Sequence, residues 1–330
     1  MTVRLTDAEI DDLVARFDVM SMGEWDRGAV ERVTADLGWT LRSEVRHGLT
    51  FVGPLPGGWN YAHRGHVLGS PGEGCFTSLE CDLARTDDDG VLGAVFKAAN
   101  GAAEARMGPA PIRRGPGPVL RWRREETLLE IEWTRDRVRL RLLATKVVEH
   151  HEYQLAEWGE RDDSVAELGV WQGYLYRHAA LRKAFTPGVR QAETWDEFGR
   201  WLGETLKALV TDMGRLDDSL DMVIRTSDDD DSRFVQFSCS AEELHLEAAD
   251  GARKALLESG TGWQFGTGPV RLPEIRVPNP GPGDAEPAAR ALVHALRAQD
   301  VRLEDLVHMV WLRGESDHAP NMHGLGLPEI

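Results

Sequence analysis

The chain has 330 residues, of which 42% are hydrophobic and 28% are charged. This length allows two domains of ordinary size, each with its own hydrophobic core. No run of residues approaches the roughly 18 consecutive apolar residues that a membrane helix needs, so we expect no membrane partner. The formal net charge of −17 argues against nucleic acids and anionic lipid surfaces, and it favours a basic protein as partner.

Two features indicate the compartment. The chain opens with the acidic segment MTVRLTDAEIDDL, where a secretory signal peptide would carry a basic stretch followed by an apolar one. The three cysteines, Cys75, Cys81 and Cys239, include no CxxC pair, and their odd number predicts free thiols rather than a disulfide framework or a zinc site. We therefore expect a cytoplasmic protein without a metal or cofactor.

Two helices are predicted at the start of the chain. Thr6 and Glu9 have the spacing of a capping box, and apolar residues follow on one helical face, so the first helix is expected over residues 6–17. The second is expected from Asp26 to residue 37, because Gly38 suits the left-handed conformation that ends a helix.

The rest of the first half predicts an antiparallel sheet with one more helix. Residues 39–83 form several short apolar runs separated by glycine-rich turns, which is typical of strands. Residues 91–107 are rich in alanine and predict a helix. The clearest hairpin follows, because apolar residues alternate with charges over 129–133 and again over 138–142.

The first half resembles a known family. The features that it shares are the opening RLTDAEIDDLVARF, the LGW at residues 37–39, the helix that ends before a Gly-Pro loop, and the Leu120-Arg121-Trp122 strand before the hairpin. Over residues 4–159 they resemble the actinobacterial domain of unknown function 6301. These motifs are structural, so the resemblance implies a fold and a genomic setting but no active site.

In the second half, a connecting helix is expected over residues 174–185, ended by Pro187-Gly188. Thr194 caps a long amphipathic helix, and residues 221–249 alternate as three antiparallel strands. Further helices are expected over three ranges, 252–257, 285–297 and 303–312. We predict a first domain at 1–160, a connecting segment at 161–191 and a second domain at 192–330.

This order of elements is similar to that of the TY-Chap domains, which are actinobacterial relatives of type III secretion chaperones. The likeness covers residues 192–313 and includes Trp195, the strands RFVQF and LHLEAA, Gly262-Trp263 and the helix ALVHALR. Asp250 departs from it, because an asparagine is expected there. The resemblance implies a non-enzymatic domain that shields a protein partner and often dimerises through its sheet or its last helix.

Two acidic turns are the candidate partner-binding sites. Grouped carboxylates can make charge-assisted contacts with arginine and lysine of a basic partner. The spacing is not that of an EF-hand, and no distal glutamate follows, which argues against calcium. The predicted contact residues are Asp228, Asp229, Asp230, Asp231, Asp87, Asp88 and Asp89.

The histidines are weaker candidates. His150 and His151, flanked by glutamates, are expected on a strand, where adjacent side chains point to opposite faces and cannot easily share a metal ion. His63 and His66 lie in a predicted loop without the glutamate of a zinc hydrolase motif. The glycine-rich carboxyl terminus, with its two histidines, is expected to be flexible.

The sequence thus predicts an α+β protein of two domains, each an antiparallel sheet with helices packed on it, the second being similar to type III secretion chaperones. No catalytic motif is present. The expected function is non-enzymatic: an immunity protein or chaperone that masks a basic secreted toxin or effector. Alternatives are a structural or regulatory homodimer, and an enzyme with a pocket lined by His63, His66 or His150.

Overall fold

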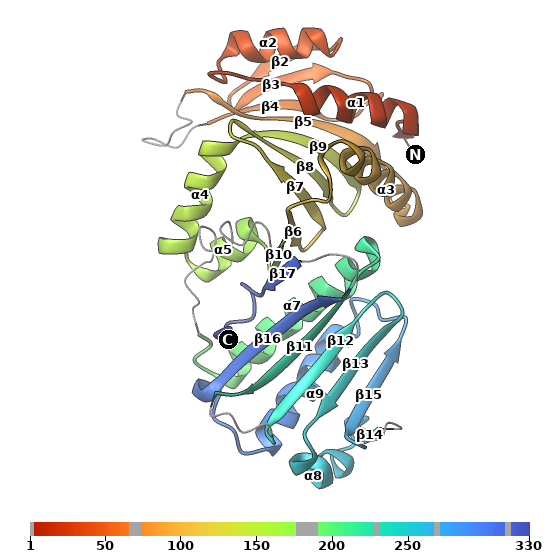
Figure 1. The fold of residues 1–330 in the computed structure, drawn as a ribbon, viewed down its shortest axis with the longest axis vertical. Coiled ribbons are helices and arrows are strands. Elements are labelled where there is room, and N and C mark those ends of the chain that lie inside the picture. The colour runs from red at the N-terminus through yellow and green to blue at the C-terminus, as the bar shows by residue number, and fades with distance from the viewer. Residues whose placement is uncertain (1–2, 66–73, 176–190, 228–231, 267–270, 314–317) are drawn as a thin grey trace. The chain divides into compact units, whose positions relative to one another are not determined.

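A computed structural model describes residues 3–65, 74–175, 191–227, 232–266, 271–313 and 318–330 (Figure 1). The fold class is α+β with antiparallel sheets, as predicted. The chain divides into two compact units. The first comprises Met1–Arg113 and Gly117–Gln154, and the second comprises Arg114–Pro116 and Leu155–Ile330.

The predicted helices of the first unit are present. Helix α1 (Asp7–Val19) begins after Thr6, whose hydroxyl accepts a hydrogen bond from the Glu9 backbone N–H, and the Glu9 carboxylate accepts one from the Thr6 N–H in return. The capping box is therefore confirmed. Helix α2 (Arg27–Asp36) is capped by the Asp26 side chain, and α3 (Asp89–Met107) covers the alanine-rich segment.

The sheet of the first unit has the strand order β7-β8-β9-β5-β4-β3-β2, and β1 pairs with β5. The pairs for which a register is known are antiparallel. The bounds are β1 (Val3–Arg4), β2 (Thr40–Val45), β3 (Gly48–Val52), β4 (Asn60–Arg64), β5 (Phe76–Arg85), β7 (Val119–Arg123), β8 (Thr127–Trp133) and β9 (Arg137–Ala144); β6 (Ile112–Gly115) spans the change from the first unit to the second.

Alternation along these strands produces two different faces. One face is apolar and packs against α3, which α1 contacts in turn, and the ring centroid of Phe96 on α3 lies 5.6 Å from that of Trp133. Leu79, Leu129 and Leu140 are fully buried on it. The opposite face carries charged side chains, and helix α4 (Thr145–Trp158) supplies further charges to it.

The second unit contains a six-stranded sheet of order β14-β15-β13-β12-β11-β16. Its strands are β11 (Ser219–Thr226), β12 (Phe234–Cys239), β13 (Glu243–Ala248), β14 (Gln264–Phe265), β15 (Pro273–Pro278) and β16 (Leu306–Arg313). Strand β10 (Trp171–Leu175) pairs antiparallel with β17 (His318–Asn321). The helices are α5 (Arg161–Leu168), α7 (Trp195–Leu216), α8 (Arg253–Glu258) and α9 (Ala285–Ala298).

Helices α7 and α9 cover one face of the six-stranded sheet (Figure 1). Thr194 caps α7 as predicted, and Phe198, Leu202 and Leu206 on the apolar stripe of α7 are fully buried. The core of the unit combines this stripe with the inward residues of β11 to β13. Among the helices that the structure describes, none is both long enough and apolar enough to cross a bilayer.

One predicted helix is wrong. Residues 303–312 form a short 3-10 turn (Leu303–Asp305) followed by strand β16, which pairs with β11 over eight residues. The sequence LVHMVWLR is rich in residues that favour strands, and pairing beside β11 outweighs its helical spacing. The second correction concerns His150 and His151, which lie on helix α4 and not on a strand.

Two further expectations concern the second unit. The connecting helix predicted at residues 174–185 lies mostly outside the described residues, and its first two positions belong to strand β10. The carboxyl terminus, expected to be flexible, is packed instead: β17 pairs with β10, and Met322, Leu325 and Leu327 join the hydrophobic core. The apolar spacing of these three residues explains the difference.

Candidate functional site

The charged face of the first unit is built by cross-strand pairing. On β8, Glu130 and Glu132 point to the face opposite the helices, and on β9, Arg139 and Arg141 do the same. The register places Glu130 opposite Arg141 and Glu132 opposite Arg139. Opposite charges that face each other across strands stabilise a sheet. The hairpin sequence itself therefore creates this row of ion pairs, which we call the charged ladder.

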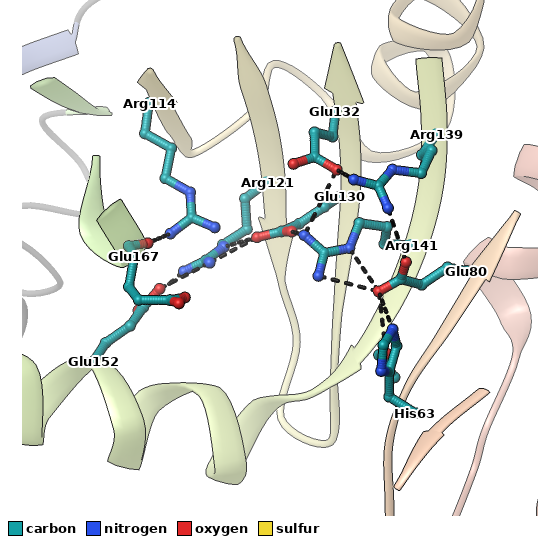
Figure 2. A network of polar contacts seen from close by, with 11 residues as sticks. His63, Glu80, Arg114, Arg121, Glu130, Glu132, Arg139, Arg141, Glu152 and Glu167 are labelled. Carbon is teal, nitrogen blue, oxygen red and sulfur yellow. Dashed lines mark hydrogen bonds and ion pairs between the residues drawn. The ribbon is translucent and has the colours of Figure 1, made fainter. Parts of the chain in front are cut away.

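Two neighbouring strands extend the ladder (Figure 2). Arg121 of β7 lies 2.6 Å from a Glu130 oxygen, and Arg141 contacts the other Glu130 oxygen at 3.1 Å. On the opposite side, Glu80 of β5 accepts hydrogen bonds of 3.2 Å from both Arg139 and Arg141. Glutamate and arginine therefore alternate across four strands.

Helix α4 closes one end of this ladder. The Glu152 carboxylate accepts two hydrogen bonds from the Arg121 guanidinium, at 2.9 and 3.1 Å. One turn earlier, Glu149 pairs with Arg123. These glutamates are the ones that flank His150 and His151 in the sequence, and their carboxylates hold arginines rather than a metal-binding arrangement with the histidines.

Burial makes the ion pairs of this face electrostatically strong. Glu130, Glu80 and Arg121 are all buried. Burial alone disfavours the charged Arg121 guanidinium, but the attraction of Glu152 and Glu130 outweighs it and raises the pKa of Arg121. The pKa of Arg141 is likewise raised, because Glu130 and Glu80 outweigh its desolvation. Both arginines therefore remain charged at any pH at which the protein folds.

The ladder reaches solvent at His63 on β4. Its Nε2 lies 3.6 Å from a Glu80 oxygen, and the side chain is 46% exposed. Partial burial lowers the pKa of His63 below its usual value, while Glu80 opposes this shift. The imidazole is the group of this face whose ordinary pKa lies nearest neutrality.

His63 also belongs to an aromatic strip, which we define as Trp59, Tyr61 and His63 together with Val52 and Val45. The Tyr61 ring lies 4.2 Å from His63, edge to face, and 5.3 Å from Trp59, stacked. The pairing of β3 with β4, continued by one residue, places Val52 opposite Trp59. Val52 is 57% exposed and Trp59 45% exposed, so the strip presents apolar surface to solvent beside the charged ladder.

The strip ends at the sheet edge. Strand β2 is the last strand on this side, and all six of its residues are exposed. Among the strands that the structure describes, β3 is the one with which β2 pairs. The outer backbone groups of β2 are therefore available for pairing with another chain.

The predicted aspartate sites lie elsewhere. Asp88 caps α3, accepting hydrogen bonds from the Gly90 and Val91 N–H groups, so it has a structural role. Asp87 lines a cavity of about 230 Å³ in the first unit together with Asp136, and Asp89 begins α3. The second turn, comprising Asp228, Asp229, Asp230 and Asp231, lies outside the described residues.

The charged ladder itself was missed by sequence reasoning. Its signal is the alternation of LLEIEW with RVRLRLL, which taken alone predicts one apolar face and one charged face in contact with solvent. The charges on the second face are buried or half-buried instead, because Arg121, Glu80 and Glu152 come from segments distant in sequence and meet only in the fold. His66 lies outside the described residues, and His63 lies on strand β4 rather than in the predicted loop.

A scan against protein-family models gives no match, and searches of the curated proteins and of the solved structures give no significant match.

Proposed function

We propose that this chain is a non-catalytic protein-binding protein, an immunity protein or effector chaperone that covers a basic secreted partner. The observation that carries the proposal is the aromatic strip, with Trp59 and Val52 exposed beside buried ion pairs and an open strand edge. Tryptophan, tyrosine and arginine dominate the binding energy of protein interfaces. An exposed edge strand adds backbone pairing as a second mode of recognition.

Charge supports a basic partner. The chain carries 55 acidic residues against 38 lysines and arginines. A net charge of this sign increases the rate of encounter with a basic protein and suppresses binding to acidic ones. On the charged face, the arginines are already held by glutamates, so the ladder is a rigid platform beside the strip. The exposed Asp87, Asp88 and Asp89, which lie apart from the strip, remain candidate contacts.

A homodimer is the second candidate, and strand β16 favours it. This strand ends the second sheet, and Trp311 on its outward face is 42% exposed. Two copies could pair through the edge strand β2, or through the outward face of β16 around Trp311; the backbone edge of β16 is partly occupied, because His308 bonds with Pro328 and Ile330. Measurement of mass in solution over a range of concentrations tests this: a constant monomer mass contradicts the dimer.

The binding function is tested by capture from the native cell lysate. The tagged protein is incubated with lysate at low salt, and co-purifying proteins are identified by mass spectrometry. We expect a basic protein to co-purify, and we expect Val52→Asp and Trp59→Ala to abolish its recovery, because both remove apolar surface from the aromatic strip.

A matched control is available on α1. Val19 is 82% exposed and lies outside the strip, so Val19→Asp adds the same negative charge elsewhere. It should leave recovery unchanged. Capture of no protein other than the chain itself contradicts the proposed function, as does equal recovery by the Val52→Asp and Val19→Asp variants when both are folded.

A further inference from the structure

The outer face of the second sheet carries a compact group of ligating side chains. Strand β13 presents His245 and Glu247 on this face, since residues two apart in a strand share a side. Glu274 of β15 lies directly opposite Glu247 in the antiparallel register. The opposite face of the sheet packs against α7 and α9, so the backbone that holds the three residues is part of the core of the unit.

The distances suit a single metal ion. His245 Nε2 lies 3.0 Å from a Glu274 oxygen and 3.8 Å from a Glu247 oxygen, and one ligand atom from each residue lies within 4.8 Å of the other two. An ion bound at about 2.1 Å from each ligand separates ligands by at most roughly 4.2 Å. Small side-chain rotations therefore close the group around an ion. We propose that His245, Glu247 and Glu274 bind a zinc ion on this face.

The local charge favours a dication. The carboxylates of Glu243 and Glu274 contact the guanidinium of Arg276, and a third carboxylate, that of Glu247, lies beside His245. Arg276 divides its nitrogens between Glu243, at 3.3 Å, and Glu274, at 3.1 Å. Glu247 and Glu274 face each other as like charges, an arrangement that destabilises a sheet unless a cation compensates it. With neutral His245, a divalent ion balances the remaining charge.

The surroundings also orient the ligands. The Gln236 side-chain amide donates to one oxygen of Glu247, while the other Glu247 oxygen faces His245. Hydrogen bonds of this kind fix the rotamers of metal ligands and strengthen binding. Glu274 is almost fully buried, and a Cβ added at Gly266 would lie 3.3 Å from its oxygen, so Gly266 lies close against this carboxylate.

The donor set selects zinc over calcium and magnesium. One imidazole nitrogen with two carboxylate oxygens is a set that zinc accepts, whereas calcium and magnesium prefer oxygen ligands alone. When the ion displaces Arg276 from Glu274, the guanidinium keeps its ion pair with Glu243 and is still charge-compensated. Three protein ligands leave a coordination position for water. The bound ion would join β13 to β15.

The test is titration of the full-length, tag-free protein with zinc sulfate by calorimetry, with equilibrium dialysis and elemental analysis of the retained zinc. His245→Ala and Glu274→Gln should each weaken zinc binding at least tenfold. Glu242→Gln is the matched control, because it removes an exposed carboxylate that immediately precedes the same strand, outside the group. Unchanged affinity in both ligand variants, with folding verified by circular dichroism, overturns the proposal.

Arg276 provides a test in the opposite direction. Its guanidinium competes with the ion for Glu274, so Arg276→Gln should strengthen zinc binding several-fold. If the group is only an ion-pair network, His245→Ala and Arg276→Gln both leave zinc binding at the level of the Glu242→Gln control, which overturns the proposal. The measurement needs no protein partner, so its result is independent of the proposed binding function.

Discussion

The Arg121 guanidinium donates two hydrogen bonds to the Glu152 carboxylate, at 2.9 and 3.1 Å, across 31 positions of sequence. Arg121 lies on β7 and Glu152 on α4, so this ion pair fixes the helix to the charged face of the sheet. Both side chains are buried. A buried pair contributes modestly to net stability, but loss of one partner leaves an uncompensated charge in a poorly solvated place.

The first prediction is that Arg121→Met strongly destabilises the first unit. The substitution keeps much of the side-chain volume but leaves Glu130 and Glu152 without the guanidinium between them. The expected loss in free energy of unfolding is about 3–5 kcal/mol. Urea unfolding followed by tryptophan fluorescence measures it. Arg16→Met breaks the exposed pair with Asp12 and should cost less than about 1 kcal/mol; equal losses in the two variants would contradict the prediction.

The second prediction concerns the titration of His63. Partial burial lowers its pKa below 6.5, and the Glu80 carboxylate raises it partly back. Glu80→Gln removes that attraction, so the pKa of His63 should fall further. The ring proton signal of His63, followed by NMR across acidic to neutral pH, gives both values. Glu104→Gln on α3 is the control and should leave the His63 titration unchanged; a rise in the Glu80→Gln variant would refute the assignment.

The third prediction concerns Asp82, a buried carboxyl on β5 that accepts a hydrogen bond from the Trp59 N–H. Burial raises its pKa above 3.8, and the Trp59 hydrogen bond opposes this shift. The folded state therefore holds the proton more tightly than the unfolded state. It follows that this group's contribution to stability falls as pH rises from 3.8 through the raised pKa.

The side-chain amide in the Asp82→Asn variant cannot ionise. The free-energy cost of burying a charged carboxylate at this position, which depends on pH, therefore disappears. The difference in free energy of unfolding between this variant and the wild type should shift in favour of the variant as pH rises from about 3.5 to about 7. Urea unfolding at several pH values measures this difference. A difference that stays constant with pH would show that Asp82 does not titrate abnormally.

Local sequence patterns predicted much of this fold because they act over a few residues. The capping box at Thr6 and Glu9 and the cap at Thr194 need only hydroxyl and carboxyl groups at fixed spacing from a helix start. The hairpin of β8 and β9 needs only alternation and a turn. These elements were predictable because sequence neighbours become spatial neighbours.

The rest depended on contacts between distant segments. Residues 306–313 form a strand because β11 offers an eight-residue partner, which no local pattern reveals. The alternation of apolar and charged residues in the hairpin predicts that Glu130 and Arg141 share a face. It does not reveal that Arg121 and Glu152 pack over this face. The group of His245, Glu247 and Glu274 likewise required the register of β13 with β15. Pro273, Pro278 and Pro280, in and just after β15, argue against a strand there when only the sequence is considered.

The last prediction tests whether the carboxyl-terminal segment is part of the core. Gly326 has a backbone φ of +72°, and a Cβ at this position would lie 2.2 Å from the Trp201 ring. Gly326→Ala therefore meets two costs, a left-handed backbone of about 1–2 kcal/mol and overpacking of about 1–3 kcal/mol. Thermal unfolding of the second unit should shift to lower temperature by an amount that reflects their sum.

A substitution at Gly260 distinguishes the backbone cost from the overpacking cost. It has a φ of +70°, but no atom lies within 4 Å of a Cβ built there, so Gly260→Ala carries the backbone cost alone. Its unfolding temperature should fall by clearly less than that of Gly326→Ala. Because the two substitutions share chemistry and backbone conformation, the remaining difference measures the contact with Trp201. Equal shifts would mean that Gly326 does not pack against Trp201 in solution and that the end of the chain is flexible after all.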